Sequence, residues 1–296
     1  WSLRLSHAHP VAAEHVDPNA PHRHTAPYAP RLAHTPRWDA FLEAVWPDPE
    51  IRAWAVRVLA VSMTGYADRA LPILLGSPGR GKTQVVALMM SVLGTYAHAA
   101  NPKLLHPNSN EHDTIVFDLK GRRLSFIDEA PAEAKTGQER LKQLTGGGEL
   151  TGRQMGQNSV TFAPTHTFVL TANDPPTLTD AAVRSRARLI PCEGDPVAVK
   201  RTRAAIGHVT GPAWRAEAPG VLAMLMREAA AWLHDTDSAS VDAAPLEIRY
   251  LAEKLGAEQD PIMVWITNET EEWPAGTGST ELYQQFTASC LRNNLR

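Results

Sequence analysis

A glycine-rich octapeptide limits the folds open to this chain more than any other part of its sequence. The segment Gly76-Ser77-Pro78-Gly79-Arg80-Gly81-Lys82-Thr83 satisfies the pattern G-x-x-x-x-G-K-[ST]. It follows the apolar run Leu71–Leu75, which suits a buried parallel strand, and it precedes a helix predicted from about Thr83 to Leu93. A chance glycine-rich turn would need neither neighbour, so we interpret the octapeptide as a phosphate-binding loop between a strand and a helix.

The residue types in this loop match what a bound nucleotide requires. Glycines let backbone N–H groups close around phosphate oxygens, and the N-terminus of the following helix adds positive potential. We expect the Lys82 ammonium to reach the β- and γ-phosphates and the Thr83 hydroxyl to bind Mg²⁺. The predicted cofactors are therefore ATP and Mg²⁺, with all eight loop residues at the nucleotide.

Two further apolar runs end in polar residues. The run from Arg123 to Ile127 is followed by Asp128 and Glu129, and the run from Thr165 to Thr171 leads to Asn173. Because the carboxyl ends of parallel strands face the ligand crevice, we expect Asp128 to hold Mg²⁺. Glu129 would then polarise the attacking water, and Asn173 would hydrogen-bond the γ-phosphate or that water. Taken alone, the acidic pair would indicate a solvated helix start and the asparagine a turn.

Three arginines alternate in the segment Arg184-Ser185-Arg186-Ala187-Arg188. They could form an ordinary solvated face. In an oligomeric ATPase, however, an arginine of the neighbouring subunit stabilises the charge on the transferred phosphoryl group. We assign that catalytic role to Arg186, with Arg184 and Arg188 as rivals.

Predicted strands alternate with predicted helices, which is typical of an α/β domain with a mostly parallel sheet. Before the loop, apolar residues at helical spacing predict two amphipathic helices separated by Pro47-Asp48-Pro49. The predicted parts, in chain order, are an irregular connector (1–36), a helical collar (37–68), the ATPase core (69–211), a helical region (212–275) and the start of a truncated C-terminal domain (276–296).

Composition narrows the classes of protein. The formal net charge is −3, from 29 Lys and Arg against 32 Asp and Glu, so a uniformly basic surface is excluded and any nucleic-acid contact must be local. Two cysteines are too few for a disulfide framework and suit a reducing compartment. The Ala-, Arg- and Pro-rich composition suits a GC-rich bacterial host or its phage, so we expect a bacterial cytoplasm or a phage-infected host. The apolar runs are too short for a membrane span. The chain begins at Trp1, so we expect it to start inside a longer polypeptide.

The order of the motifs resembles one family. A further segment lies between the predicted strand that ends before Asp128 and the one that leads to Asn173. It reads Leu141-Lys142-Gln143-Leu144-Thr145-Gly146-Gly147-Gly148-Glu149-Leu150-Thr151-Gly152-Arg153, followed by Phe162-Ala163-Pro164. Together with Asn173-Asp174-Pro175-Pro176, this series resembles the superfamily-three helicases of the poxvirus and phage or plasmid primase type, within the AAA+ ATPases. The resemblance covers Trp38 to Ile190, and Glu281–Phe286 is similar to the start of the family's winged-helix region. Gly148 replaces a usual Asp, and Arg80 a usual Asn.

This resemblance implies a ring, with a hexamer as the expected homo-oligomer, that binds ATP between subunits. It also implies that a β-hairpin projects into the channel and pulls single-stranded DNA in the 3′ to 5′ direction, for phage, plasmid or mobile-element replication. A primase or primase-polymerase module is implied upstream of Trp1.

The hairpin residues themselves favour contacts with a nucleic-acid backbone. Lys142, Arg153 and Gln154 can donate to phosphate oxygens, and no aromatic residue for base stacking lies between Thr145 and Val160. Contacts should therefore be independent of base sequence and sensitive to salt. A surface hairpin without a ligand is the plain alternative. Two other functions remain open at this point: a AAA+ switch or loader that remodels a protein partner without unwinding, and a small-molecule phosphotransferase.

Overall fold

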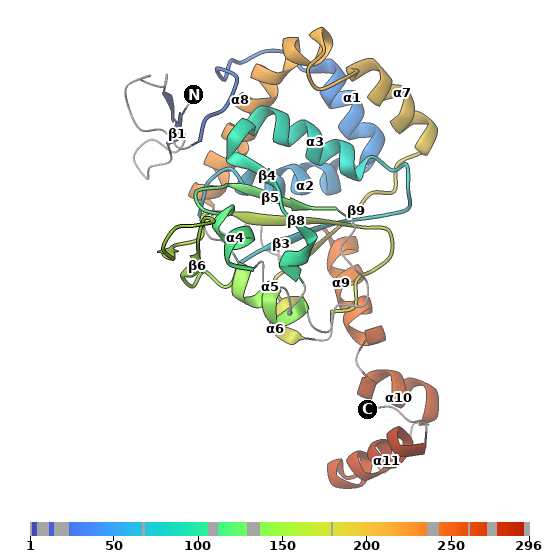
Figure 1. Ribbon diagram of the computed structural model, residues 1–296. Coiled ribbons are helices and arrows are strands. Elements are labelled where there is room, and N and C mark those ends of the chain that lie inside the picture. The colour runs from blue at the N-terminus through green and yellow to red at the C-terminus, as the bar shows by residue number, and fades with distance from the viewer. Residues whose placement is uncertain are drawn as a thin grey trace. The chain divides into compact units, whose positions relative to one another are not determined.

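A five-stranded parallel sheet forms the centre of the fold in the computed structural model (Figure 1). The strand order is β4-β5-β8-β3-β9. The structure describes residues 2–4, 12–14, 24–66, 69–105, 112–128, 137–178, 180–235, 243–259, 261–270 and 277–292. The strands are β3 (Leu71–Leu75), β4 (Ala97–Ala99), β5 (Leu124–Ile127), β8 (Thr167–Ala172) and β9 (Ala187–Pro191). The predicted α/β class with a parallel sheet is confirmed.

The middle of the sheet is buried, which explains why its strands are apolar. Every residue of β3, β5 and β8 is buried. Ile73 of β3 lies opposite Leu170 of β8 on one side and Leu189 of β9 on the other. Continuous apolar runs of this kind are typical of parallel strands that helices cover on both faces.

Helices cover both faces of the sheet (Figure 1). On one face lie α1 (Pro36–Val45), α2 (Pro49–Val61), α3 (Lys82–Leu93), α7 (Pro196–Ile206) and α8 (Pro212–His234). On the other lie α4 (His112–Phe117), α5 (Gly137–Thr145) and α6 (Ala181–Arg184). The main apolar core fills the space between the first group and the sheet, around residues such as Phe41, Leu88 and Leu222. Among the described residues, no helix is long and apolar enough to cross a membrane.

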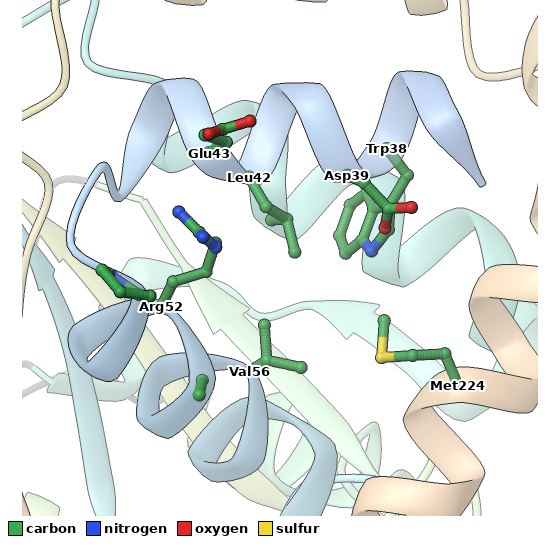
Figure 2. A pocket seen from close by; sticks show the side chains of 9 residues that line it. Trp38, Asp39, Leu42, Glu43, Arg52, Val56 and Met224 are labelled. Carbon is green, nitrogen blue, oxygen red and sulfur yellow. The ribbon is translucent and has the colours of Figure 1, made fainter.

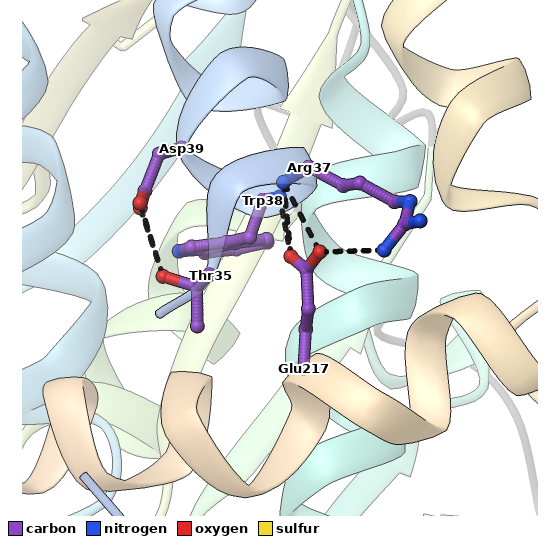
Figure 3. Close-up of polar contacts among 5 residues, drawn as sticks. All are labelled: Thr35, Arg37, Trp38, Asp39 and Glu217. Atoms are coloured by element: carbon purple, nitrogen blue, oxygen red, sulfur yellow. Dashed lines mark hydrogen bonds and ion pairs between the residues drawn. The ribbon is translucent and has the colours of Figure 1, made fainter. Parts of the chain in front are cut away.

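The first two helices begin at different kinds of cap. Asp48 caps α2 through its own carboxylate, which accepts the N–H groups of Glu50 and Ile51 at 2.7 and 3.1 Å. Helix α1 instead uses a residue of α8: the buried Glu217 carboxylate accepts the N–H groups of Arg37 and Trp38, each at 3.0 Å (Figure 3). The Arg37 guanidinium adds an ion pair at 3.0 Å. Glu217 therefore fixes the start of α1 against α8.

Residues 1–36, predicted as an irregular connector, contain one pair of short strands, and the stretch 24–35 is irregular but packed against the core. Residues Ser2–Arg4 (β1) and Ala12–Glu14 (β2) pair as antiparallel strands. Further on, Ala26 is buried in the main core, and the Thr25 and Thr95 backbones are joined by an N–H···O bond of 3.0 Å. Local spacing gave no signal for this, because tertiary contacts hold the segment.

The chain divides into two compact units, Trp1–Leu251 and Ala252–Arg296. The boundary falls inside the helical region predicted for 212–275 and within α9 (Leu246–Gln259). The second unit contains α10 (Pro261–Glu269) and α11 (Ser279–Arg292). The Trp265 and Phe286 rings meet edge to face at 5.6 Å, and Ser289 Oγ donates to Glu269 at 2.7 Å, which joins these two helices.

Candidate functional site

The predicted phosphate-binding loop connects β3 directly to the N-terminus of α3. Gly81 has a φ of 90°, in the left-handed region that favours glycine. A Cβ atom built on Gly81 would lie 2.7 Å from the Val45 side chain and 3.4 Å from the Phe41 ring, so α1 closes one side of the loop. A Cβ on Gly76 would lie 2.4 Å from the Cys192 carbonyl oxygen. Two of the loop glycines are therefore required by close packing as well as by the turn.

Lys82 is the first residue of α3, and its side chain folds back over the loop. Only 7% of Lys82 is exposed. Its ammonium group donates to the carbonyl oxygen of Gly76, to that of Ser77 at 3.1 Å and to Asn173 Oδ1 at 2.9 Å. Because β8 lies next to β3, Asn173 at the end of β8 meets the loop. The structure thus brings together two residues that the sequence analysis placed at the γ-phosphate.

Thr83, on α3, also meets Asp128, which directly follows β5. Thr83 Oγ1 donates to Asp128 Oδ1 at 3.4 Å. The Thr171 hydroxyl donates to the same carboxylate oxygen at 2.5 Å, which fixes the orientation of Asp128. Thr171 is not among the site residues predicted from sequence, although its place two residues before Asn173 on a parallel strand could have indicated it. Glu129, the predicted water-polarising residue, lies outside the described residues.

These side chains line a pocket of about 580 Å³. The lining residues that sequence analysis did not find come mainly from α7: Pro196, Val199, Lys200 and Arg203. Lys200 and Arg203 are exposed, and both are cations at the rim of a pocket that contains one described carboxylate, Asp128. A cluster of cations around a glycine-rich loop suits a polyanionic ligand. The full lining is Pro78, Gly79, Arg80, Gly81, Lys82, Thr83, Gln84, Ala87, Asp128, Thr171, Asn173, Pro196, Val199, Lys200 and Arg203.

Arg80 of the loop binds within its own chain. Its guanidinium donates to the carbonyl oxygens of Glu193, at 2.9 Å, and Gly194. Those residues lie on the connection between β9 and α7. Arg80 therefore ties the loop to the connection that carries the α7 cations.

The three alternating arginines lie away from this pocket in the same chain. The Arg186 guanidinium donates to the Lys142 carbonyl oxygen and to Thr145 Oγ1, both at 3.0 Å, and so holds the end of α5. Arg184 donates to the Leu178 carbonyl oxygen at 2.9 Å, and Arg188 to that of Ser185 at 3.1 Å. Sequence spacing could not show that all three bind backbone oxygens of their own chain.

The predicted hairpin is present after α5. Strands β6 (Leu150–Gly152) and β7 (Val160–Phe162) pair antiparallel, and the Thr151 and Thr161 hydroxyl groups are 3.0 Å apart. The connection between the strands carries Arg153 and Gln154, which are exposed. These two predicted DNA-binding residues therefore lie together on the surface.

Lys142, the third predicted DNA-binding residue, is engaged elsewhere. Its ammonium forms an ion pair with Asp180 Oδ2 at 2.8 Å. This hydrogen bond raises the pKa of Lys142 and lowers the pKa of Asp180. The pair joins α5 to the start of α6, so Lys142 holds the base of the hairpin rather than its tip.

A buried histidine also supports the base of the hairpin, at the end of α5. His166 Nε2 lies 3.2 Å from the Leu144 carbonyl oxygen at the end of α5, and its ring meets Phe168 edge to face at 4.7 Å. Burial lowers the pKa of His166 to about 4, so the ring is neutral at pH 7. The neutral imidazole can donate one hydrogen bond to Leu144, which orients the helix that leads into the hairpin.

Comparison with known proteins gives three findings. Residues 74–186 match the model of a family of unknown function (DUF5906). Over 137 residues the chain is 28% identical to African swine fever virus proteins named "Putative primase C962R", for instance from the Warthog/Namibia and Pig/Kenya isolates. That match covers 45% of this chain and 14% of the viral protein, so the chain spans about a seventh of its curated relatives.

Among solved structures, the apo C-terminal region of NrS-1 aligns with a TM-score of 0.51 and 13% identity. The alignment covers 88% of this chain and 64% of that one. A second form of the same region gives a TM-score of 0.50 with 15% identity. The arrangement of helices and strands in this chain is thus similar to that of the NrS-1 C-terminal region.

Proposed function

We propose that the pocket between β3, β5, β8 and α7 binds and hydrolyses ATP with Mg²⁺. The observation that carries this proposal is that Lys82, Thr83, Asp128 and Asn173 come from three separate segments and meet at one pocket. A strand, a glycine-rich loop and a helix N-terminus in this order form a phosphate cradle. The pocket volume of about 580 Å³ is within the range of small-molecule sites.

The donor set fits both groups. The Lys82 ammonium donates its hydrogen bonds to carbonyl and amide oxygens of its own chain, and phosphate oxygens can replace these acceptors. Thr83 and Asp128 offer a hydroxyl and a carboxylate oxygen, the hard ligands that Mg²⁺ prefers. When bound, Mg²⁺ would neutralise charge on the phosphate oxygens.

The protein's own residues then have distinct tasks. Lys82 stabilises negative charge at the β- and γ-phosphates, and Asn173 orients the γ-phosphate or the water beside it. Thr171 holds the Asp128 carboxylate in place through its hydroxyl. Glu129 follows Asp128 in sequence, and we assign it to the attacking water as a general base.

An arginine of a neighbouring subunit completes the site in this proposal. Arg184, Arg186 and Arg188 lie outside the pocket of their own chain, which is what a residue acting across a subunit boundary requires. We assign the role to this segment, with Arg186 first. Arg186 also holds α5, so its release from Lys142 and Thr145 would link a neighbour's nucleotide to the hairpin base.

We infer that ATP hydrolysis moves the hairpin along single-stranded DNA, in a ring of copies of this chain. Arg153 and Gln154 are exposed on the hairpin connection, where they can donate to phosphate oxygens. The similarity to a viral protein named as a primase supports a role in DNA replication. A hexamer, an upstream primase module and 3′ to 5′ travel are parts of the proposal that rest on the motif resemblance.

Steady-state ATP hydrolysis with and without single-stranded DNA tests this function. We expect single-stranded DNA to stimulate hydrolysis, Lys82→Ala to abolish it, and Arg153→Ala to lose only the stimulation. Gln157→Ala, on the same exposed connection, is the matched control. Stimulation by a protein fraction but not by DNA would replace the helicase with a AAA+ switch, and phosphate transfer to a small acceptor without DNA would replace it with a phosphotransferase.

A further inference from the structure

A second pocket lies apart from the nucleotide site, between α1, α2 and α8 (Figure 2). It has a volume of about 340 Å³. The Leu42, Val56 and Met224 side chains form its apolar part, and Asp39, Glu43 and Arg52 form its charged part. None of these residues lines the nucleotide pocket, so the proposed ATPase reaction leaves this feature unexplained.

Trp38 supplies an unsatisfied donor in the wall of this pocket. Trp38 is 1% exposed, and its indole Nε1 is buried without a hydrogen-bond partner. The rest of the ring is well packed, 6.4 Å from Phe41 and 5.9 Å from Trp214 between ring centres. A buried N–H group without an acceptor costs free energy, and a ligand oxygen at this point would remove that cost.

An acceptor lies beside this donor. In both Figure 2 and Figure 3 the Trp38 indole nitrogen points to the side of the ring on which the Asp39 carboxyl group lies. The Asp39 oxygens accept one hydroxyl, that of Thr35, at 3.0 and 3.1 Å, which leaves lone pairs for a further donor. Burial raises the pKa of Asp39, as expected for a carboxylate that water does not fully solvate.

The charges of the pocket select a cation. Glu43 makes no hydrogen bond or ion pair within the described part of the chain, and it lies one helical turn after Asp39 on α1. The Arg52 guanidinium is already bound to the carbonyl oxygens of Trp46, at 2.7 Å, and Pro47, at 3.2 Å. Asp39 and Glu43 thus bring two negative charges to the pocket against the one positive charge that Arg52 keeps, so the lining favours a cation over a phosphate backbone.

We propose that this pocket docks a short peptide segment of a partner protein that carries an arginine beside an aliphatic residue. A peptide group offers a carbonyl acceptor to Trp38 Nε1 and an N–H donor to Asp39. The aliphatic side chain packs on Leu42, Val56 and Met224, where the flexible Met224 can adapt its shape. The arginine pairs with Glu43.

The test measures the binding of fluorescein-labelled Gly-Leu-Arg-Leu-Arg-Gly, by fluorescence anisotropy, to the whole chain. We expect saturable binding, and no binding of Gly-Leu-Glu-Leu-Glu-Gly. Asp39→Ala and Trp38→Phe should each weaken binding about tenfold, the loss of one good hydrogen bond. Glu50→Gln removes an exposed negative charge from α2 outside the pocket and should change nothing.

Two further measurements keep the proposal falsifiable. In ¹H–¹⁵N spectra of the native chain, the Trp38 indole N–H signal should shift when the arginine peptide is added. This measurement needs no substituted variant. Lys82→Ala should bind the peptide like the native chain, so failure of this site is distinct from failure of the ATPase proposal.

Several results would overturn the peptide assignment. These are no saturation up to about 1 mM peptide, equal binding of the glutamate peptide, or an unchanged affinity in Asp39→Ala. Equal affinity for butylguanidinium alone would indicate a site for small organic cations. A Trp38 signal that depends on protein concentration without peptide would indicate a second copy of this chain.

Discussion

Protonation of the buried His166 should cost the fold a measurable part of its stability at mildly acidic pH. The pKa of this ring is 6.5 in an ordinary environment and about 4 in the folded chain, because burial disfavours the charged form. Between pH 6.5 and pH 4 the His166 ring is therefore mostly protonated in the unfolded state and mostly neutral in the folded state. Stability from this group is complete above 6.5 and is lost as the pH falls toward 4.

The two pKa values set the magnitude. Between pH 7.5 and pH 5 the folded state should lose about 2 kcal/mol of unfolding free energy through His166 alone. Because Leu144 and the hairpin base depend on this ring, the same loss should loosen α5. Other groups also titrate in this range, so the native chain must be compared with a variant that lacks only this proton.

Urea unfolding at several pH values, for the native chain and for His166→Gln, isolates the effect. Glutamine keeps an N–H donor for the Leu144 carbonyl but does not titrate. We expect the two stability curves to converge by about 2 kcal/mol between pH 7.5 and pH 5. Parallel curves, or an NMR titration of His166 with a pKa near 6.5, would refute the reasoning.

Three further predictions concern the site and its frame. Lys82→Ala should lower the rate of phosphate release from ATP by about 10²-fold or more, because a charge stabiliser is removed, while thermal unfolding still shows a folded chain. Gly81→Ala should destabilise the fold by about 1–3 kcal/mol, since φ is 90° and a Cβ would lie 2.7 Å from Val45; urea unfolding checks this, with Gly147→Ala as a control that has a positive φ but no neighbour within 4 Å. Glu217→Ala should cost about 1–3 kcal/mol by the same measurement, because the Arg37 and Trp38 N–H groups lose their acceptor. Equal stability of either variant to the native chain would contradict the contact concerned.

Much of the fold around the phosphate loop could be predicted from sequence. The strand at Leu71–Leu75 agrees with β3, and the helix predicted from Thr83 begins one residue earlier, at Lys82. The two helices separated at Pro47–Pro49 are also confirmed as α1 and α2. These elements carry strong local signals, namely apolar runs, helical spacing, glycines and an aspartate cap.

Elements without a local signal were missed. Strand β4 has three residues, and β9 contains Arg188 beside apolar positions, so neither stands out as a buried run. Both are strands because they pair with β5 and β3. Pairing partners lie far away in sequence, and a short segment does not reveal them.

The polar contacts that shape the site depend on tertiary structure even more. Glu217 caps α1 from 180 residues away along the chain, and Lys142 pairs with Asp180 instead of facing a ligand. The α7 cations Lys200 and Arg203 reach the pocket because the Arg80 contacts hold the preceding connection. Sequence spacing can place residues on one strand end, but it cannot place a helix side chain across a pocket.

The most direct measurement of the proposed motor is directional displacement of streptavidin from a single-stranded oligonucleotide biotinylated at one end. With ATP and Mg²⁺, the native chain should release streptavidin from the 5′ end faster than from the 3′ end, and Lys82→Ala and Arg153→Ala should release neither. If the native chain hydrolyses ATP while streptavidin is released no faster than without ATP, the conversion of hydrolysis into movement along DNA is contradicted.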